Sequence, residues 1–155
     1  MNAKAEKLKK FVEEIYPGVF QIDEVPNDPD ENIIFRSFIT VHGQQFPTVA
    51  IIDNSVFITL RTLIAPRALD DNNSAQLLKF VNKENQLYKP FKLFIDDDGD
   101  ILLESCLVSN DDNVDTISIF LIFDVIAQYL TNTYRKIMKL VWAGIDDLNS
   151  DVKYH

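Results

Sequence analysis

The feature that most constrains the fold is a long apolar run near the C-terminus with the period of a helix. From about Val114 to Trp142, apolar residues recur every three or four positions and form one stripe, as in an amphipathic helix that packs on a core. The stripe comprises Ile119, Ile122, Phe123, Ile126, Leu130, Tyr134, Ile137 and Val141. At about 1.5 Å per residue this helix is roughly 40 Å long. We therefore expect it to face a sheet.

The N-terminal half of this helix carries a second apolar set on the opposite side: Val114, Ile117, Leu121 and Val125. A helix that is apolar on both sides must be covered on both sides. Another segment of the same chain, such as an earlier helix, could cover this set. Alternatively, the set is a homodimer or partner surface, because large exposed apolar patches are rare on monomers.

The segments before this helix alternate between helical and β-strand patterns. Residues 3–15 have helical spacing, residues 19–25 alternate as a short strand, and residues 33–41, 46–52 and 56–63 are β-rich runs with short connections, typical of an antiparallel meander. Pro47 predicts a strand that lies at an edge or begins just after it. Residues 70–74 supply N-cap candidates for a second helix that ends near Leu87.

Two further strands follow around Asp98-Gly99, and Asp112 with Asp115 resembles a capping box for the last helix. The predicted fold is thus α+β, with an antiparallel sheet and a long C-terminal helix. We expect one domain over residues 1–155, with its core in about 3–142 and a flexible tail over 143–155.

Composition and charge exclude several classes of function. The chain has 155 residues, 46% of them hydrophobic, and a net charge of −9, which is unfavourable for binding nucleic acid. Its one cysteine, Cys106, cannot form an intramolecular disulfide, which favours a reducing compartment. The N-terminus has no apolar signal region. Asp124 and Gln128 interrupt the longest apolar stretch, residues 117–130, so we expect this segment to be too short and too polar to span a bilayer. We expect a cytoplasmic protein that binds neither nucleic acid nor membranes.

The stretch FIDDDGDILLES raises the question of a calcium site at Asp96, Asp98 and Asp100. An EF-hand loop aligned on Gly99 would place Phe94 and Ser105 at its first and last positions, where oxygen ligands from carboxylates are required. The alternating flanks and the Asp-Gly pair instead indicate a hairpin with a type I′ turn. We interpret this stretch as a solvated hairpin tip, with a weak cation site as the alternative.

The residues do not form a catalytic motif. His42 and Cys106 could in principle act as base and thiol, but neither lies in a Cys-His protease signature, and the usual phosphate-binding, serine hydrolase and zinc protease motifs are absent. We expect neither an enzyme nor a cofactor. Asn82 and Asn85 share a face of the second helix. They either tie the helix end to the following strand or line a polar ligand or peptide site.

Residues 33–142 resemble the YbjN-type bacterial sensory transduction regulator family. The resemblance depends on Leu77, Leu78, the spacing of Asn82 and Asn85, the runs Phe91 to Ile95 and Ile101 to Glu104 around Asp98-Gly99, and the long apolar helix after them. It implies an α-β-β-β-α-β-β-α sandwich similar to type III secretion chaperones. Such proteins are often dimeric, bind an extended segment of a client protein and use no cofactor. The strand at 19–25 is additional to that pattern.

Our leading hypothesis is a non-enzymatic protein- or peptide-binding regulatory module, chaperone-like and homodimeric, whose client the sequence does not identify. The acidic net charge is compatible with a basic client. The alternative is a small-molecule or cation-sensing domain that uses the acidic hairpin 96–100 or an apolar pocket.

Overall fold

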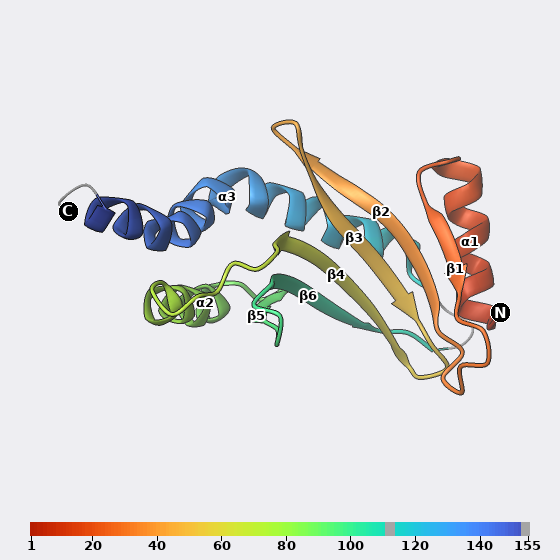
Figure 1. The fold of residues 1–155 in the computed structure, drawn as a ribbon. Helices are drawn as coiled ribbons and strands as arrows, with labels where there is room; N and C mark the ends of the chain where they lie inside the picture. Colours follow the sequence, from red (N-terminus) through yellow and green to blue (C-terminus); the bar gives the residue numbers. More distant parts are fainter. Residues whose placement is uncertain (111–113, 153–155) are drawn as a thin grey trace.

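The part of the chain that the structure describes folds as three helices and one six-stranded antiparallel sheet (Figure 1). The computed structural model describes the backbone of residues 1–110 and 114–152, and the side chains as far as residue 143. The elements are α1 (Ala3–Ile15), β1 (Gln21–Glu24), β2 (Ile33–Val41), β3 (Gln44–Ile52), β4 (Phe57–Ala65), α2 (Ser74–Leu87), β5 (Lys92–Ile95), β6 (Ile101–Val108) and α3 (Thr116–Val152). The strand order is β1-β2-β3-β4-β6-β5. The predicted α+β class, the extra early strand and the long C-terminal helix are confirmed.

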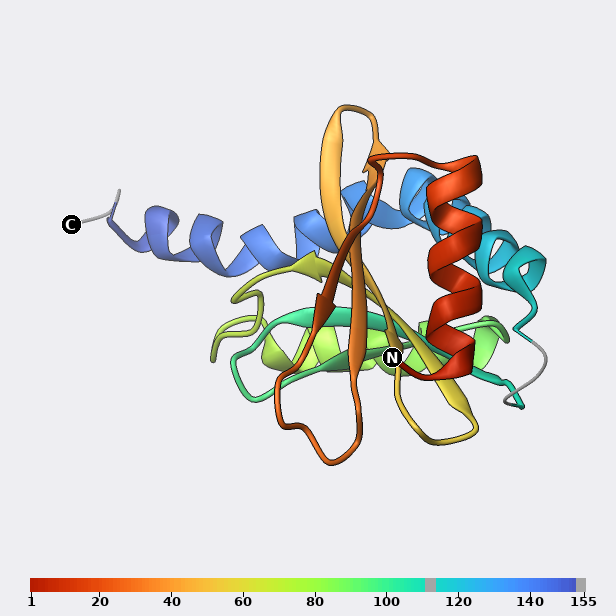
Figure 2. The ribbon, with the colours of Figure 1, turned by 90° about the vertical axis from the view of Figure 1, so that its right-hand side faces the viewer.

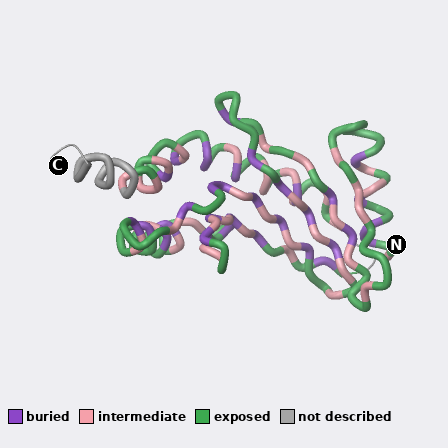
Figure 3. The backbone as a smooth tube through the Cα atoms, viewed as in Figure 1, coloured by how far each residue is buried: buried purple, intermediate pink, exposed green. Residues whose placement is uncertain are grey.

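The three helices all pack on the same face of the sheet. Along β2, Ile33, Phe35 and Val41 are buried whereas Arg36 and Phe38 are exposed, and the same alternation is visible along the other long strands (Figure 3). The strand pairing brings these buried residues to one side, where they form two apolar clusters with the helices. The fold therefore has two layers, with the core between the helices and one face of the sheet.

Helix α3 spans both clusters and crosses the sheet, whereas α1 stands beside β1 and β2 (Figures 1 and 2). Ile119 packs in the cluster that contains α1, and Ile126, Leu130 and Ile137 pack in the cluster that contains α2. The predicted stripe is thus the buried side of the helix. The helix continues to Val152 rather than ending near Trp142, so residues 143–152 are helical where we expected a tail.

The start of α3 differs by two residues from the prediction. Asp115 is the N-cap: its carboxylate accepts hydrogen bonds from the Ser118 backbone N–H at 3.0 Å and from the Ser118 hydroxyl. These bonds lower the pKa of Asp115 below its ordinary value. Asp112, the other member of the expected capping box, lies outside the described residues.

Pro47 lies inside β3, a central strand, and not at an edge or before the strand start. It pairs with Phe38 of β2, while β4 pairs with β3 only from Thr48 onward. The missing N–H of Pro47 therefore removes no hydrogen bond from the β3–β4 ladder. This register explains why a proline is tolerated there.

By length and composition, the Thr116–Ala143 part of α3 could cross a bilayer, contrary to our expectation of a segment too short and too polar. A core helix of a soluble protein meets the same two criteria, so this match is weak support for a membrane span. In the fold, Ile119, Ile126, Leu130 and Ile137 are buried among sheet and helix side chains.

Candidate functional site

The outer edge of β2 is only half covered by a neighbouring strand. The short strand β1 pairs with residues Ile33 to Arg36, and the β2–β3 hairpin extends beyond it (Figures 1 and 2). The Val25 N–H donates to the Asn32 carbonyl at 3.2 Å, so residue 32 directs its backbone groups toward the β1 side. Because these directions alternate along a strand, the other even-numbered residues of β2 also direct their N–H and C=O groups to that outer side. Phe38 and Thr40 follow this alternation, and across the described ranges 1–110 and 114–152 no strand pairs with them on that side.

Two cavities flank this unpaired edge, one on each face of the sheet. The larger, about 360 Å³, lies on the side away from the helices and is lined by Arg36, Phe38, Pro47 and Val49 among others. The smaller, about 160 Å³, lies on the helix side and is lined by an aromatic group with Val19. That aromatic group is Tyr16, Phe20, Phe38, Phe120 and Phe123. Phe38, with 57% of its surface exposed, borders both cavities.

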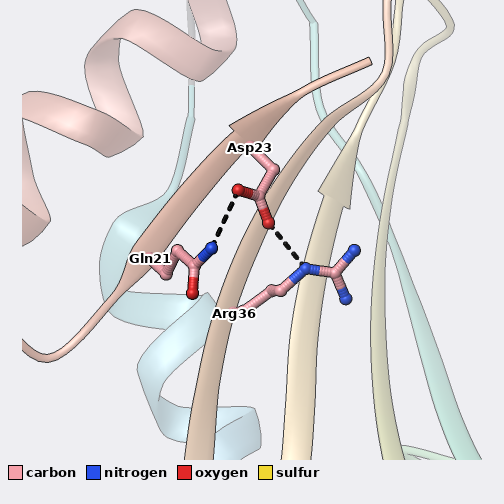
Figure 4. Close-up of polar contacts among 3 residues, drawn as sticks. All are labelled: Gln21, Asp23 and Arg36. Carbon is pink, nitrogen blue, oxygen red and sulfur yellow. Dashed lines mark hydrogen bonds and ion pairs between the residues drawn. The ribbon is translucent and has the colours of Figure 1, made fainter.

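An ion pair fixes β1 against β2 beside the larger cavity (Figure 4). The Asp23 carboxylate accepts hydrogen bonds from Arg36 Nε at 2.7 Å and from the Gln21 amide at 3.1 Å. The Arg36 bond and then the Gln21 bond hold the pKa of Asp23 below its usual value. In Figure 4 the two terminal nitrogens of Arg36 point away from Asp23. Arg36 can therefore still donate to a carbonyl or carboxylate in the cavity.

The sheet face opposite the helices, which we call the open sheet face, is also apolar. Phe38, Phe57 and Val108 are exposed on it, and Ile34 and Ile51 are partly buried. Sequence reasoning did not identify this surface. The available signal was that IIFRSFITV and FPTVAII carry apolar residues at both alternating positions, which indicates a strand with two apolar faces.

The predicted partner surface on α3 is exposed. Ile117 is 70%, Leu121 57% and Val125 36% exposed, whereas Val114 packs in part against the cluster that contains α1. Helix α2 packs farther along α3, near Tyr129, so the alternative in which it covers this set is wrong. The alternative of a homodimer or partner surface stays a prediction.

The acidic hairpin is closed by its own carboxylates. Asp96 Oδ1 accepts from the backbone N–H groups of Asp98 at 3.0 Å and Asp100 at 2.9 Å, and Asp100 Oδ1 accepts from the Arg67 N–H at 2.7 Å. One carboxylate oxygen each from Asp96, Asp98 and Asp100 lies within 4.8 Å of the others. The structure thus brings the three predicted ligands together, although two of them already accept hydrogen bonds.

The turn in this hairpin is not type I′, because only Gly99 has positive φ, at 79°. The Gly99 N–H donates to the Asp96 carbonyl at 3.0 Å, and Asp96 pairs with Asp100. This is a three-residue loop, a type I turn followed by a left-handed residue. The Gly99 carbonyl accepts from Ala68 at 2.8 Å, so contact with a distant segment selects the longer loop.

The two candidate catalytic residues do not meet. His42 lies in the β2–β3 turn, whereas the strand pairing aligns Cys106 with Ile34 through Thr59 and Ile51. Seven residues of β2 lie between Ile34 and His42, so these two residues are roughly 25 Å apart along the extended strand. Burial, then the charges of Glu104 and Asp53, raise the pKa of the Cys106 thiol, which disfavours the thiolate.

Asn85 ties α2 to the edge strand β5. Its amide nitrogen donates to the Leu93 carbonyl at 2.9 Å, and its amide oxygen accepts from the Leu93 N–H at 2.7 Å. The interpretation that these asparagines join the helix end to the following strand is confirmed for Asn85. Asn82 is exposed on the same helix.

Comparison with known proteins does not assign the chain to a family. No protein-family model matches the sequence, and no curated protein matches it either. The function is therefore inferred from the surfaces described above.

Proposed function

We propose that this protein is a non-enzymatic, chaperone-like regulatory module of the YbjN type that binds an extended segment of a client protein at the outer edge of β2. The observation that carries the proposal is an unpaired strand edge with an apolar cavity on each side of it. Strand addition of this kind combines main-chain hydrogen bonds, which give affinity, with side-chain pockets, which give specificity.

The geometry of the edge specifies how the client segment binds. The outward N–H and C=O groups of Phe38 and Thr40 form the ladder with the added strand. Successive side chains of a strand point to opposite faces, so neighbouring client residues enter the larger and the smaller cavity in turn. Both cavities have apolar walls, which selects an alternating pair of apolar client side chains.

Replacing Thr40 with proline tests this mode directly. Proline removes an N–H that points outward, so the β2–β3 ladder keeps its hydrogen bonds. We expect Thr40→Pro to reduce client recovery at least tenfold in affinity capture from the native lysate, quantified by mass spectrometry. Thr40→Val is the matched control, because it changes the same exposed side chain and keeps the N–H.

The decisive comparison is between these two variants, after circular dichroism has shown that both are folded. Client recovered by wild type and Thr40→Val but not by Thr40→Pro supports strand addition. Equal recovery by all three proteins contradicts it.

A second candidate function, cation sensing at the acidic hairpin, has one observation in its favour: the convergence of the Asp96, Asp98 and Asp100 oxygens within 4.8 Å. This candidate predicts calcium binding tighter than about 10 μM, within the range of sensor sites. Asp98→Asn is expected to weaken that binding and to preserve the hydrogen bonds that the Asp96 and Asp100 carboxylates accept from backbone N–H groups. Calorimetry that detects no heat with the wild-type protein removes this candidate.

A further inference from the structure

We infer that the open sheet face is the interface of a homodimer, in which the open face of a second copy of this chain packs against it. The three helices cover the other face, and among the residues that the structure describes none lies over this one. The interface and the proposed client site share Arg36, Phe38, Pro47 and Val49, which line the larger cavity on this face. A strand added at the β2 edge lies in the plane of the sheet, however, and leaves the row from Ile34 to Cys106 and the pair of Phe57 with Val108 free.

Apolar residues lie on both sides of the centre of this face. The band on one side of the centre contains three strand pairs. Phe38 pairs with Pro47, Leu63 pairs with Leu102, and Leu102 also pairs with Phe94. In the other direction the strand pairing joins Ile34, Ile51, Thr59 and Cys106 in one row, and Phe57 pairs with Val108, which is 74% exposed. The face therefore presents two apolar bands that a matching sheet can cover.

The charged side chains between the two bands are already partnered within the same chain. Asp23 is bonded to Arg36, and Glu104 Oε2 lies 2.6 Å from Arg61 Nη2. Lys92 donates to the carbonyls of Asn85 at 2.6 Å and Tyr88 at 2.7 Å. Each of these charged groups thus already has a hydrogen-bond partner in its own chain, so contact between two copies leaves none of them unsatisfied.

The distribution of charge also favours self-association through the open sheet face over self-association through the other surfaces of the protein. The open sheet face carries three basic and two acidic side chains, although the chain as a whole has a net charge of −9. Most of the negative charge therefore lies elsewhere. Contact through this face keeps the acidic surfaces of the two copies apart.

The area is sufficient for a stable dimer. With strands about 4.8 Å apart and about 3.3 Å per residue, the six strands present roughly 700 Å² on one face. Two copies would bury about 1,400 Å², within the range of about 1,200–2,000 Å² for specific interfaces.

The experiment measures the oligomeric state of the full chain by light scattering after size exclusion, near 50 μM. We expect the wild type to be a dimer and Thr59→Lys to be a monomer, because this substitution places a long charged side chain between Ile51 and Cys106 in one of the two apolar bands. The matched variant Leu121→Glu, on the exposed side of α3, is expected to remain a dimer. A monomeric wild type, or a dimer that Leu121→Glu dissociates and Thr59→Lys does not, overturns the inference.

A second measurement requires no substitution. Cys106 is exposed in the single copy and lies on the open sheet face. Its rate of reaction with a thiol reagent is expected to fall at least fivefold as the protein is concentrated from monomer to dimer. A dimer in which Cys106 reacts at the same rate at every concentration rejects this face as the interface, whatever the variants show.

Discussion

Replacing Asn85 with alanine is expected to lower the free energy of unfolding by about 2–4 kcal/mol. The Asn85 side chain satisfies both backbone groups of Leu93, a residue that is buried in the core. Removing the amide leaves a donor and an acceptor without partners, and each unsatisfied buried group costs about 1–3 kcal/mol. Urea unfolding followed by circular dichroism measures the difference.

Asn82→Ala is the matched control, three residues earlier on the exposed side of the same helix. It changes the same residue type to alanine and is expected to alter stability by no more than about 0.5 kcal/mol. Equal effects of the two substitutions would show that Asn85 acts through helix propensity and not through its bonds to Leu93.

The two edge regions of the sheet differ in whether their outward backbone groups have partners within the chain. At the β5 end, a side chain from α2 occupies the place that another strand would take, which protects the edge. At the β2 end, β1 stops pairing at Arg36 and the edge continues without a partner strand as far as the structure describes the chain. The contrast supports the proposal that the β2 edge is kept free for a client.

The elements that the sequence predicted correctly are those specified by local patterns. The helical spacing of Ile119, Ile126 and Ile137 identified the buried side of α3, because a long helix has one stripe for one sheet. Short connections such as the turn at His42 and Gly43 identified the meander of β2 to β4, because such turns join only antiparallel neighbours.

The features that the sequence did not predict depend on contacts between distant segments. The three-residue loop at Asp97 to Gly99 depends on the backbone of Ala68, and no local pattern reports that contact. Lys4 is buried and donates to the Ser55 carbonyl, although a lysine in a first turn is typical of a solvated surface. The candidate site itself follows from where β1 begins, at Gln21 opposite Arg36, whereas alternation alone predicted a strand over residues 19–25.

Replacing Tyr129 with phenylalanine is expected to destabilise the protein by about 1–3 kcal/mol at pH 7. The Tyr129 hydroxyl donates to Glu84 Oε1 at 3.1 Å, and both side chains are buried between α2 and α3. The substitution keeps the ring, which packs against Tyr88 and Phe91 at centroid distances of 4.8 Å. The loss is therefore that of the hydrogen bond to a buried carboxyl group, measured by urea unfolding.

The pH dependence tests whether the Tyr129 hydroxyl is buried beside Glu84. Burial, then the charge of Glu84, raise the pKa of Tyr129 far above its ordinary value near 10. A group whose pKa is raised by folding contributes its full stability below the unfolded pKa and loses it as the pH rises, here above about pH 10, by about 1.4 kcal/mol per unit. The stability difference between wild type and Tyr129→Phe should therefore shrink between about pH 9.5 and 11. A Tyr129→Phe difference that stays constant over this range would contradict a hydroxyl buried beside Glu84 between α2 and α3.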